Sequence, residues 1–171
     1  GIGHVRWATH GIPNTVNAHP HSSEIVSVVH NGIIENSDEL KKKLEKEGIK
    51  FKSQTDTEVI TFLITKALES SDPLDSVFLT LEKLKGSFAL GILFKNHNNI
   101  IIGARRGSPL AVGYAKNENY LGSDSYALKS MTNKITYLDD GEFCILRKNS
   151  VEFFDDSGNK VNKRVLELSN E

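Results

Sequence analysis

The stretch SFALGILFKNHNNIIIGAR (residues 87–105) decides the fold class of this chain. Two apolar runs, 87–94 and 100–105, flank a polar segment whose Asn residues tolerate the left-handed backbone conformations of tight turns. This pattern predicts a β-hairpin with its loop at 95–99. From the hairpin onward the sequence has the character of strands, whereas the residues before it favour helices.

Helix-start signals precede the hairpin at three places. Asn36, with a Glu three residues later, predicts a helix over 37–47. Thr55 and its Glu form a capping box that predicts a helix over 56–70, and Asp72-Pro73 starts a third helix. Helices grouped before a block of mostly antiparallel strands predict an α+β domain with helices layered on a sheet.

An apolar run over 24–30 predicts a buried strand upstream of the helices. We expect it to end at Asn31-Gly32, because Asn and Gly both accept positive φ angles and commonly form turns. After the hairpin, strands are expected at 111–115, 119–122, 135–138, 142–148, 151–154 and 161–166, with a short helix near 125–130.

Composition indicates an ordinary globular protein of one domain. The 171 residues are 38% hydrophobic and 25% charged, with a net charge of −1 at pH 7. Such a balance gives no uniform basic field for nucleic acid or an anionic membrane, so neither partner is expected. No apolar run approaches the roughly 18 residues of a membrane span. The single cysteine, Cys144, excludes an internal disulfide framework and predicts a reducing compartment, the cytoplasm.

Histidines are concentrated in the first 30 residues, around an aperiodic, loop-like segment over 9–23. A metal site built from His10, His19, His21 and His30 is one interpretation. No carboxylate or second cysteine accompanies them at a recognised ligand spacing, and imidazoles also bond backbone groups. The sequence therefore predicts no metal.

Three further features each have a structural and a functional interpretation. Asn31-Gly32 is either a turn or an oxyanion hole made of a side-chain amide and a backbone N–H. Asp56 is either a first-turn carboxylate favoured by the helix dipole or a ligand for a substrate ammonium group. Arg6 beside Trp7 is either a surface cation-π pair or a clamp for a carboxylate.

The order of the motifs is more specific than any one of them. RWATHG (6–11), NAHPH (17–21), VHNGIIEN (29–36) and TDTE (55–58) together resemble the glutaminase domain of the glutamine:fructose-6-phosphate aminotransferases. That family belongs to the N-terminal-nucleophile (class II) glutamine amidotransferases. The resemblance continues through GSPL (107–110), SD (123–124) and LDDG (138–141), so it covers nearly the whole chain.

The resemblance implies roles for the polar residues. Arg6 would hold the α-carboxylate of glutamine and Asp56 its α-ammonium group. Asn31 and the N–H of Gly32 would stabilise the tetrahedral oxyanion. The remaining implied site residues are Thr9 and His10, which would line the glutamine loop, Trp7, which would gate ammonia, and His19, which lies in the same loop.

The family fold is a four-layer αββα sandwich of the N-terminal-nucleophile hydrolase type, and the resemblance implies that this chain lacks its N-terminal elements. The family nucleophile is an amino-terminal cysteine whose own α-amino group serves as the base. Residue 1 is Gly, and Cys144 lies in an alternating strand typical of a buried structural thiol. We therefore expect a truncated glutaminase domain, inactive alone.

The complete enzyme implied by the resemblance makes glucosamine 6-phosphate. It would bind glutamine here and fructose 6-phosphate in a sugar isomerase domain absent from this chain, act as a homodimer and need no cofactor. Two alternatives remain open. One is a non-catalytic amino-acid-binding module that keeps the Arg6/Asp56 clamp, and the other is a glutaminase domain that serves a different acceptor.

Overall fold

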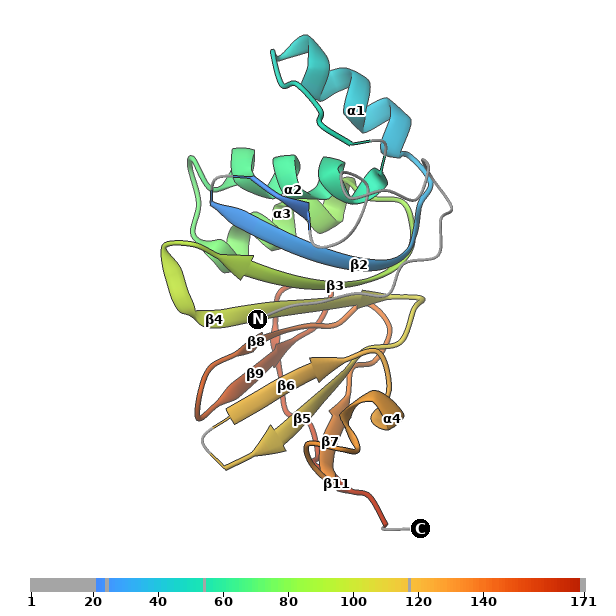
Figure 1. The fold of residues 1–171 in the computed structure, drawn as a ribbon, viewed down its shortest axis with the longest axis vertical. Coiled ribbons are helices and arrows are strands. Elements are labelled where there is room, and N and C mark those ends of the chain that lie inside the picture. The colour runs from blue at the N-terminus through green and yellow to red at the C-terminus, as the bar shows by residue number, and fades with distance from the viewer. Residues whose placement is uncertain (1–20, 24, 54, 117, 170–171) are drawn as a thin grey trace.

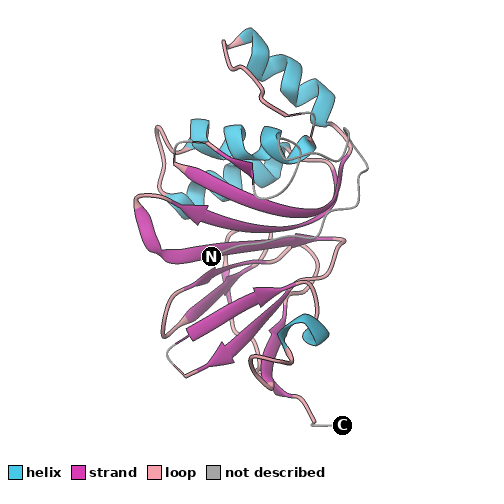
Figure 2. Ribbon diagram, viewed as in Figure 1, coloured by secondary structure: helices cyan, strands magenta, loops and turns pink. Residues whose placement is uncertain are grey.

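The computed structural model describes residues 21–23, 25–53, 55–116 and 118–169. The first part comprises β1 (His21–Ser22), β2 (Val26–Ile34), α1 (Ser37–Lys46), α2 (Asp56–Ala67) and α3 (Pro73–Lys83). The second comprises β3 (Gly86–Phe94), β4 (His97–Arg106), β5 (Ala111–Ala115), β6 (Glu118–Gly122), α4 (Ser125–Leu128), β7 (Lys134–Tyr137), β8 (Phe143–Leu146), β9 (Val151–Phe154), β10 (Lys160–Val161) and β11 (Leu166–Glu167). Figure 2 shows this separation of helices from the main block of strands, which confirms the α+β prediction.

The strands form two antiparallel sheets that lie against each other. A seven-stranded sheet has the order β1-β2-β3-β4-β8-β9-β10, and a four-stranded sheet has the order β11-β7-β5-β6. Helices α2 and α3 cover one face of the larger sheet, and the smaller sheet lies on its other side (Figure 1). Helix α4 packs on the smaller sheet through Leu128, beside Ala111 and Ile135. The layers therefore follow the order αββα that the resemblance implies, with the short helix α4 on the outer face of the smaller sheet.

Strand β3 shows why the central strands are apolar throughout. Phe88, Leu90 and Ile92 lie in the core beneath the helices, whereas Ala89 lies in the core between the two sheets. Successive side chains of a strand point to opposite faces. A strand buried on both faces therefore reads as a continuous apolar run rather than an alternating one.

The hairpin between β3 and β4 is tighter than predicted. Its turn consists of residues 95 and 96 alone, and Phe94 pairs with His97. A register irregularity between Leu93 and Phe94 closes the hairpin over these two residues. Residues 97–99, expected in the loop, therefore extend β4 instead.

The predicted end of β2 at Asn31-Gly32 is wrong. The strand continues to Ile34 and stays paired with β3, with Asn31 opposite Ala89 and Gly32 opposite Phe88. Gly32 has a φ of +108°, and a Cβ added there would lie 2.1 Å from the carbonyl oxygen of Ser87. Glycine is thus required here because two paired strands approach each other closely, and not because the chain turns.

The helix starts are confirmed at Ser37, Asp56 and Pro73, but the capping partners at the first two differ from the prediction. The Asn36 side chain accepts the N–H of Lys85 at 2.9 Å and donates to the carbonyl of Lys83 at 2.8 Å. The Glu58 carboxylate accepts two backbone N–H groups of the segment before α2, those of residues 52 and 53, each at 2.6 Å. Both side chains therefore fix tertiary or loop structure.

The strand expected at 161–166 is divided between the two sheets. Strand β10 pairs with β9 in the larger sheet, and β11 pairs with β7 in the smaller one. Residues 162–165 connect them, and we call this segment the crossing segment.

Helix α2 also ends earlier than expected, at Ala67. Across the described residues, none of the helices has the length and apolar character that crossing a membrane requires.

Candidate functional site

Three of the predicted site residues, Asn31, Gly32 and Asp56, belong to the described part of the chain. The other five, Arg6, Trp7, Thr9, His10 and His19, lie outside it, so their roles stay predictions.

Asp56 is the first residue of α2 and is held against β2. Its side chain is 7% exposed, and Oδ2 accepts the backbone N–H of Ile34 at 3.1 Å. Ile34 follows Gly32 by two residues on the same strand. The start of the helix, where the dipole favours negative charge, therefore meets the end of the strand that carries Asn31-Gly32. The structure brings these three predicted residues to one place.

His30 strengthens this junction from the strand side. Its ring is buried, and Nδ1 lies 3.0 Å from the Thr57 hydroxyl and 3.7 Å from Oδ1 of Asp56. Sequence reasoning considered His30 only as one of four candidate metal ligands, and it gave Thr57 no role of its own. The signal for both was their position inside the VHNGIIEN and TDTE motifs, directly beside predicted site residues.

Asn31 and Gly32 lie on an accessible stretch of β2. The preceding strand residues Val26, Val28 and His30 are buried, whereas Asn31, Gly32 and Ile33 are exposed in succession. An oxyanion donor has to be reachable by substrate, and this stretch meets that requirement.

A second pair of motifs meets beside this stretch. A Cβ added at Gly107, which has a φ of +79°, would lie 2.5 Å from Oγ of Ser87, the residue that also crowds Gly32. The N–H of Gly107 donates to Oδ1 of Asp140 at 2.7 Å. The GSPL and LDDG motifs therefore support the start of β3, directly next to Gly32. Sequence reasoning noted both motifs but gave neither a place in the site.

The local chemistry is compatible with binding a cationic group at Asp56. A carboxylate offers about four lone-pair positions and can therefore accept hydrogen bonds from several donors at once. The buried setting strengthens any charge-assisted hydrogen bond made there, relative to one in water.

Cys144 is not part of this site. It lies on β8, fully buried between the sheets, and burial raises the pKa of its thiol to about 12. A thiol protonated at neutral pH is neither an effective nucleophile nor a metal ligand. The prediction of a buried structural cysteine is confirmed.

Two hollows of the described surface lie elsewhere. A groove of about 330 Å³ runs between α1 and α2 over Leu40, Leu44 and Leu63. One of about 220 Å³ lies near Ile25 and Phe94. Within the described ranges, no three His, Cys, Asp or Glu side chains are grouped so as to hold a metal ion.

Comparison with known proteins gives a family and several relatives. The sequence model of a family described as a glutamine amidotransferase domain matches residues 8–130. The glutamine–fructose-6-phosphate aminotransferase (isomerizing) of Mesorhizobium japonicum is 51% identical over 165 residues, which are 96% of this chain and 27% of that protein. The enzyme of the same name from Brucella abortus is 48% identical over 171 residues, with 99% and 28% covered.

Among solved structures, the glutamine phosphoribosylpyrophosphate amidotransferase from B. subtilis superposes with a TM-score of 0.74 at 28% identity. The match covers 92% of this chain and 35% of that one. The chain thus spans little more than a quarter of the length of the curated relatives it matches.

Proposed function

We propose that this chain, which belongs to the family of glutamine amidotransferase domains, is the larger part of the glutamine-binding and glutamine-hydrolysing domain of an enzyme that forms glucosamine 6-phosphate from fructose 6-phosphate. The observation that carries the proposal is the bond from the Ile34 N–H to Asp56, which anchors this carboxylate beside Asn31-Gly32. The name shared by relatives near 50% identity supports the choice of acceptor.

In this proposal the two ends of glutamine are bound by different groups. Asp56 holds the α-ammonium group, and Arg6 holds the α-carboxylate. Both are charge-assisted hydrogen bonds, which are roughly twice as strong as neutral ones. Thr9, His10 and His19 line the loop around the substrate, and Trp7 gates the ammonia that is released.

Asn31 and the N–H of Gly32 act on the other end of the substrate. When a nucleophile attacks the side-chain amide of glutamine, the carbonyl oxygen becomes an oxyanion. Donors fixed in advance at that oxygen stabilise the transition state more than the ground state, which raises kcat. A glycine held by tight strand pairing suits this task, because its N–H is positioned by the fold rather than by substrate.

The nucleophile is not Cys144, because that thiol is buried and its pKa is raised to about 12. Glutamine hydrolysis in this class proceeds through a thioester on an amino-terminal cysteine. We therefore assign the nucleophile to a residue outside these 171 and expect the chain alone to release no glutamate from glutamine. The full-length enzyme is proposed to be a cytoplasmic homodimer that needs no cofactor and takes fructose 6-phosphate in a separate isomerase domain.

The test uses the full-length gene product with fructose 6-phosphate and either glutamine or ammonium chloride as nitrogen donor. Asp56→Asn is the informative variant, because its amide oxygen still accepts the Ile34 N–H while the negative charge is lost. We expect glutamine-dependent formation of glucosamine 6-phosphate to fall and ammonia-dependent formation to survive. A parallel fall in both activities would show that Asp56 has a structural role. If the wild-type protein formed no product from either donor, the assignment of fructose 6-phosphate as the acceptor would be wrong.

A non-catalytic amino-acid-binding module is the second candidate, favoured by the burial of Cys144. Calorimetry separates the two functions when it is combined with a glutamate assay. Binding of glutamine by the full-length product without release of glutamate would support the binding module.

A further inference from the structure

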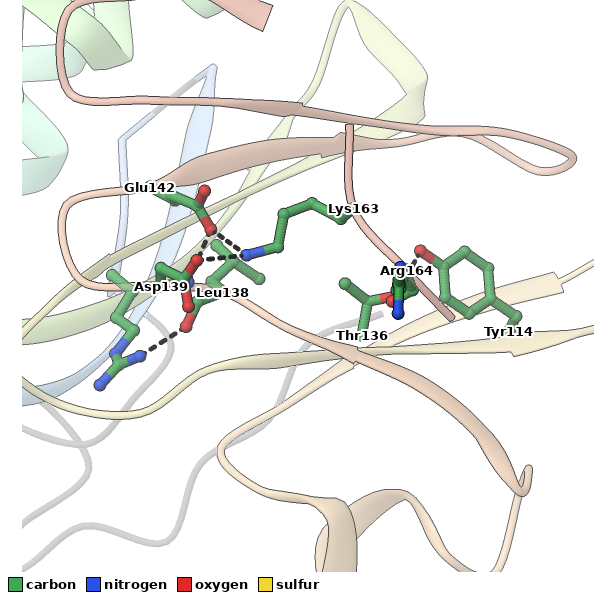
Figure 3. A network of polar contacts seen from close by, with 8 residues as sticks. Tyr114, Thr136, Leu138, Asp139, Glu142, Lys163 and Arg164 are labelled. Atoms are coloured by element: carbon green, nitrogen blue, oxygen red, sulfur yellow. Dashed lines mark hydrogen bonds and ion pairs between the residues drawn. The ribbon is translucent and has the colours of Figure 1, made fainter. Parts of the chain in front are cut away.

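The crossing segment ties the two sheets together at a point far from Asn31-Gly32 in the sequence. Before it, Val161 pairs with Phe153 of the larger sheet, and after it, Leu166 pairs with Ile135 of the smaller sheet. Within it, the carbonyl of Arg164 accepts a hydrogen bond from the Thr136 hydroxyl at 3.0 Å (Figure 3).

Lys163 is the residue of this segment that reaches into the protein. Its Nζ donates to Oδ2 of Asp139 at 2.8 Å and to Oε1 of Glu142 at 2.6 Å (Figure 3). The Lys163 and Glu142 side chains are only 11% and 8% exposed, whereas Asp139 is 80% exposed. Burial lowers the pKa of Lys163, but the hydrogen bonds with Asp139 and Glu142 outweigh it, so the pKa lies above its ordinary value. Removing the ammonium group would leave the Glu142 carboxylate buried without this cation, a costly arrangement.

The two carboxylates belong to the turn over residues 138–142, whose shape depends on the same contact. The Glu142 oxygen bound to Lys163 also accepts the backbone N–H of Asp139 at 2.6 Å. From this turn, the N–H of Gly141 donates to the Arg105 carbonyl at 3.0 Å. Asp140 accepts the N–H of Gly107 at 2.7 Å. The turn therefore holds the chain on both sides of residue 106, at the end of β4.

Gly107 connects the 138–142 turn to the candidate site, because it packs against Ser87 at the start of β3. Ser87 lies between two glycines: its Oγ would be 2.5 Å from a Cβ on Gly107, and its carbonyl oxygen 2.1 Å from a Cβ on Gly32. Neither glycine backbone leaves space for even a Cβ atom on the side that faces Ser87, so a shift of the Gly107 loop toward Ser87 would displace β3. Packed interiors transmit such displacements because they contain few voids.

We propose that Lys163 is a positioning residue for the oxyanion site: by fixing the 138–142 turn it holds Gly107 against Ser87, and Ser87 in turn sets the backbone of Gly32. The inference rests on the proposed function for its effect on glutamine hydrolysis. Its structural part, from Lys163 to Gly107, is independent of that function and is measured separately.

The experiment compares three variants of the full-length gene product. Lys163→Met removes the cation. Asp140→Ala removes the acceptor of the Gly107 N–H, and because this side chain is exposed, the substitution should not prevent folding. Thr136→Val is the matched control, because it weakens the same crossing segment at Arg164 without touching the 138–142 turn. Hydrogen exchange followed by mass spectrometry reports on peptides that contain Gly107, and steady-state kinetics gives kcat and KM for glutamine hydrolysis.

We expect Lys163→Met and Asp140→Ala to speed exchange at Gly107 by about tenfold or more. Both should lower kcat by about tenfold or more with little change in KM, because a displaced donor weakens the transition state rather than substrate binding. The double variant should be no worse than the poorer single variant, since both act through one contact. Thr136→Val should change neither readout.

Unchanged exchange at Gly107 in Lys163→Met would overturn the proposal, as would an equal change in Thr136→Val, which would indicate general loosening of the crossing segment. Fully additive losses of kcat in the double variant would also contradict it. If the wild-type protein releases no glutamate, the proposed function fails and with it the effect on catalysis. The exchange data then still decide whether Lys163 fixes the Gly107 loop.

Discussion

Replacing Gly32 with alanine tests the close approach of β2 and β3 on which the candidate site depends. Gly32 has a φ of +108°, and an added Cβ would lie 2.1 Å from the Ser87 carbonyl oxygen and 2.9 Å from Cα of Phe88. Both neighbours are backbone atoms of a paired strand, so neither can move aside by changing a rotamer. The substitution therefore forces the two strands apart.

Gly48 provides a matched control for the size of this effect. It has a φ of +95°, but nothing lies within 4 Å of an added Cβ. Both alanine variants carry the strain of a left-handed backbone, about 1–2 kcal/mol. Only Gly32→Ala adds the overlap, and overpacking of this kind costs about 1–3 kcal/mol. Alanine also stabilises both variants by lowering the conformational entropy of the unfolded chain, and this contribution is the same in both, so it cancels in the comparison.

Thermal unfolding of the purified protein measures the difference. At about 2–4 °C per kcal/mol for a domain of this size, Gly32→Ala should melt about 2–12 °C below Gly48→Ala. Gly86→Ala should resemble Gly32→Ala, because its Cβ would lie 2.2 Å from the Ile33 carbonyl oxygen. Equal midpoints for the Gly32 and Gly48 variants would refute the claim that the strands meet tightly at Gly32.

Three further predictions concern individual side chains. Cys144, whose pKa burial raises to about 12, should resist alkylation at pH 8 in the folded protein and react after denaturation, and rapid native labelling seen by mass spectrometry would contradict its burial. Because the folded pKa of Lys163 is raised, its stabilisation is complete below the unfolded pKa of about 10.4 and is lost as pH rises through the folded pKa. The midpoint difference between wild type and Lys163→Met should therefore shrink at strongly alkaline pH, and a constant difference would argue against an ionic contact. Asp72→Ala removes the acceptor for the Asp75 N–H at the start of α3 and should cost about 1 kcal/mol, whereas an unchanged midpoint would show that this cap is dispensable.

Much of the fold follows from local sequence. The apolar run of β3 is explained by burial on both faces, and the starts of all three long helices lie where the sequence signals place them. The resemblance to the glutaminase family implies that Asp56 and Asn31-Gly32 share one site, and the Ile34 bond to Asp56 supplies a physical basis for their proximity.

The remaining features depend on partners distant in the chain. Asn31-Gly32 favours a turn by local preference, and only the nearby Ser87 carbonyl explains why glycine stands within a continuous strand. Asn36 could be expected to cap its own helix, yet it bonds residues 83 and 85 instead. Nothing in residues 161–166 indicates that they divide between two sheets, because strand propensity does not specify which sheet a strand joins.

Steady-state hydrolysis of glutamine by the full-length gene product tests the central claim most directly. Loss of one oxyanion donor typically lowers kcat by about a hundredfold or more, so Asn31→Ala should do so with a modest change in KM. Asp56→Asn should instead raise KM for glutamine, because it removes the charge that binds the α-ammonium group. If Asn31→Ala keeps the wild-type kcat and Asp56→Asn the wild-type KM, these residues serve only to join β2 to its neighbours, and the glutamine site lies elsewhere.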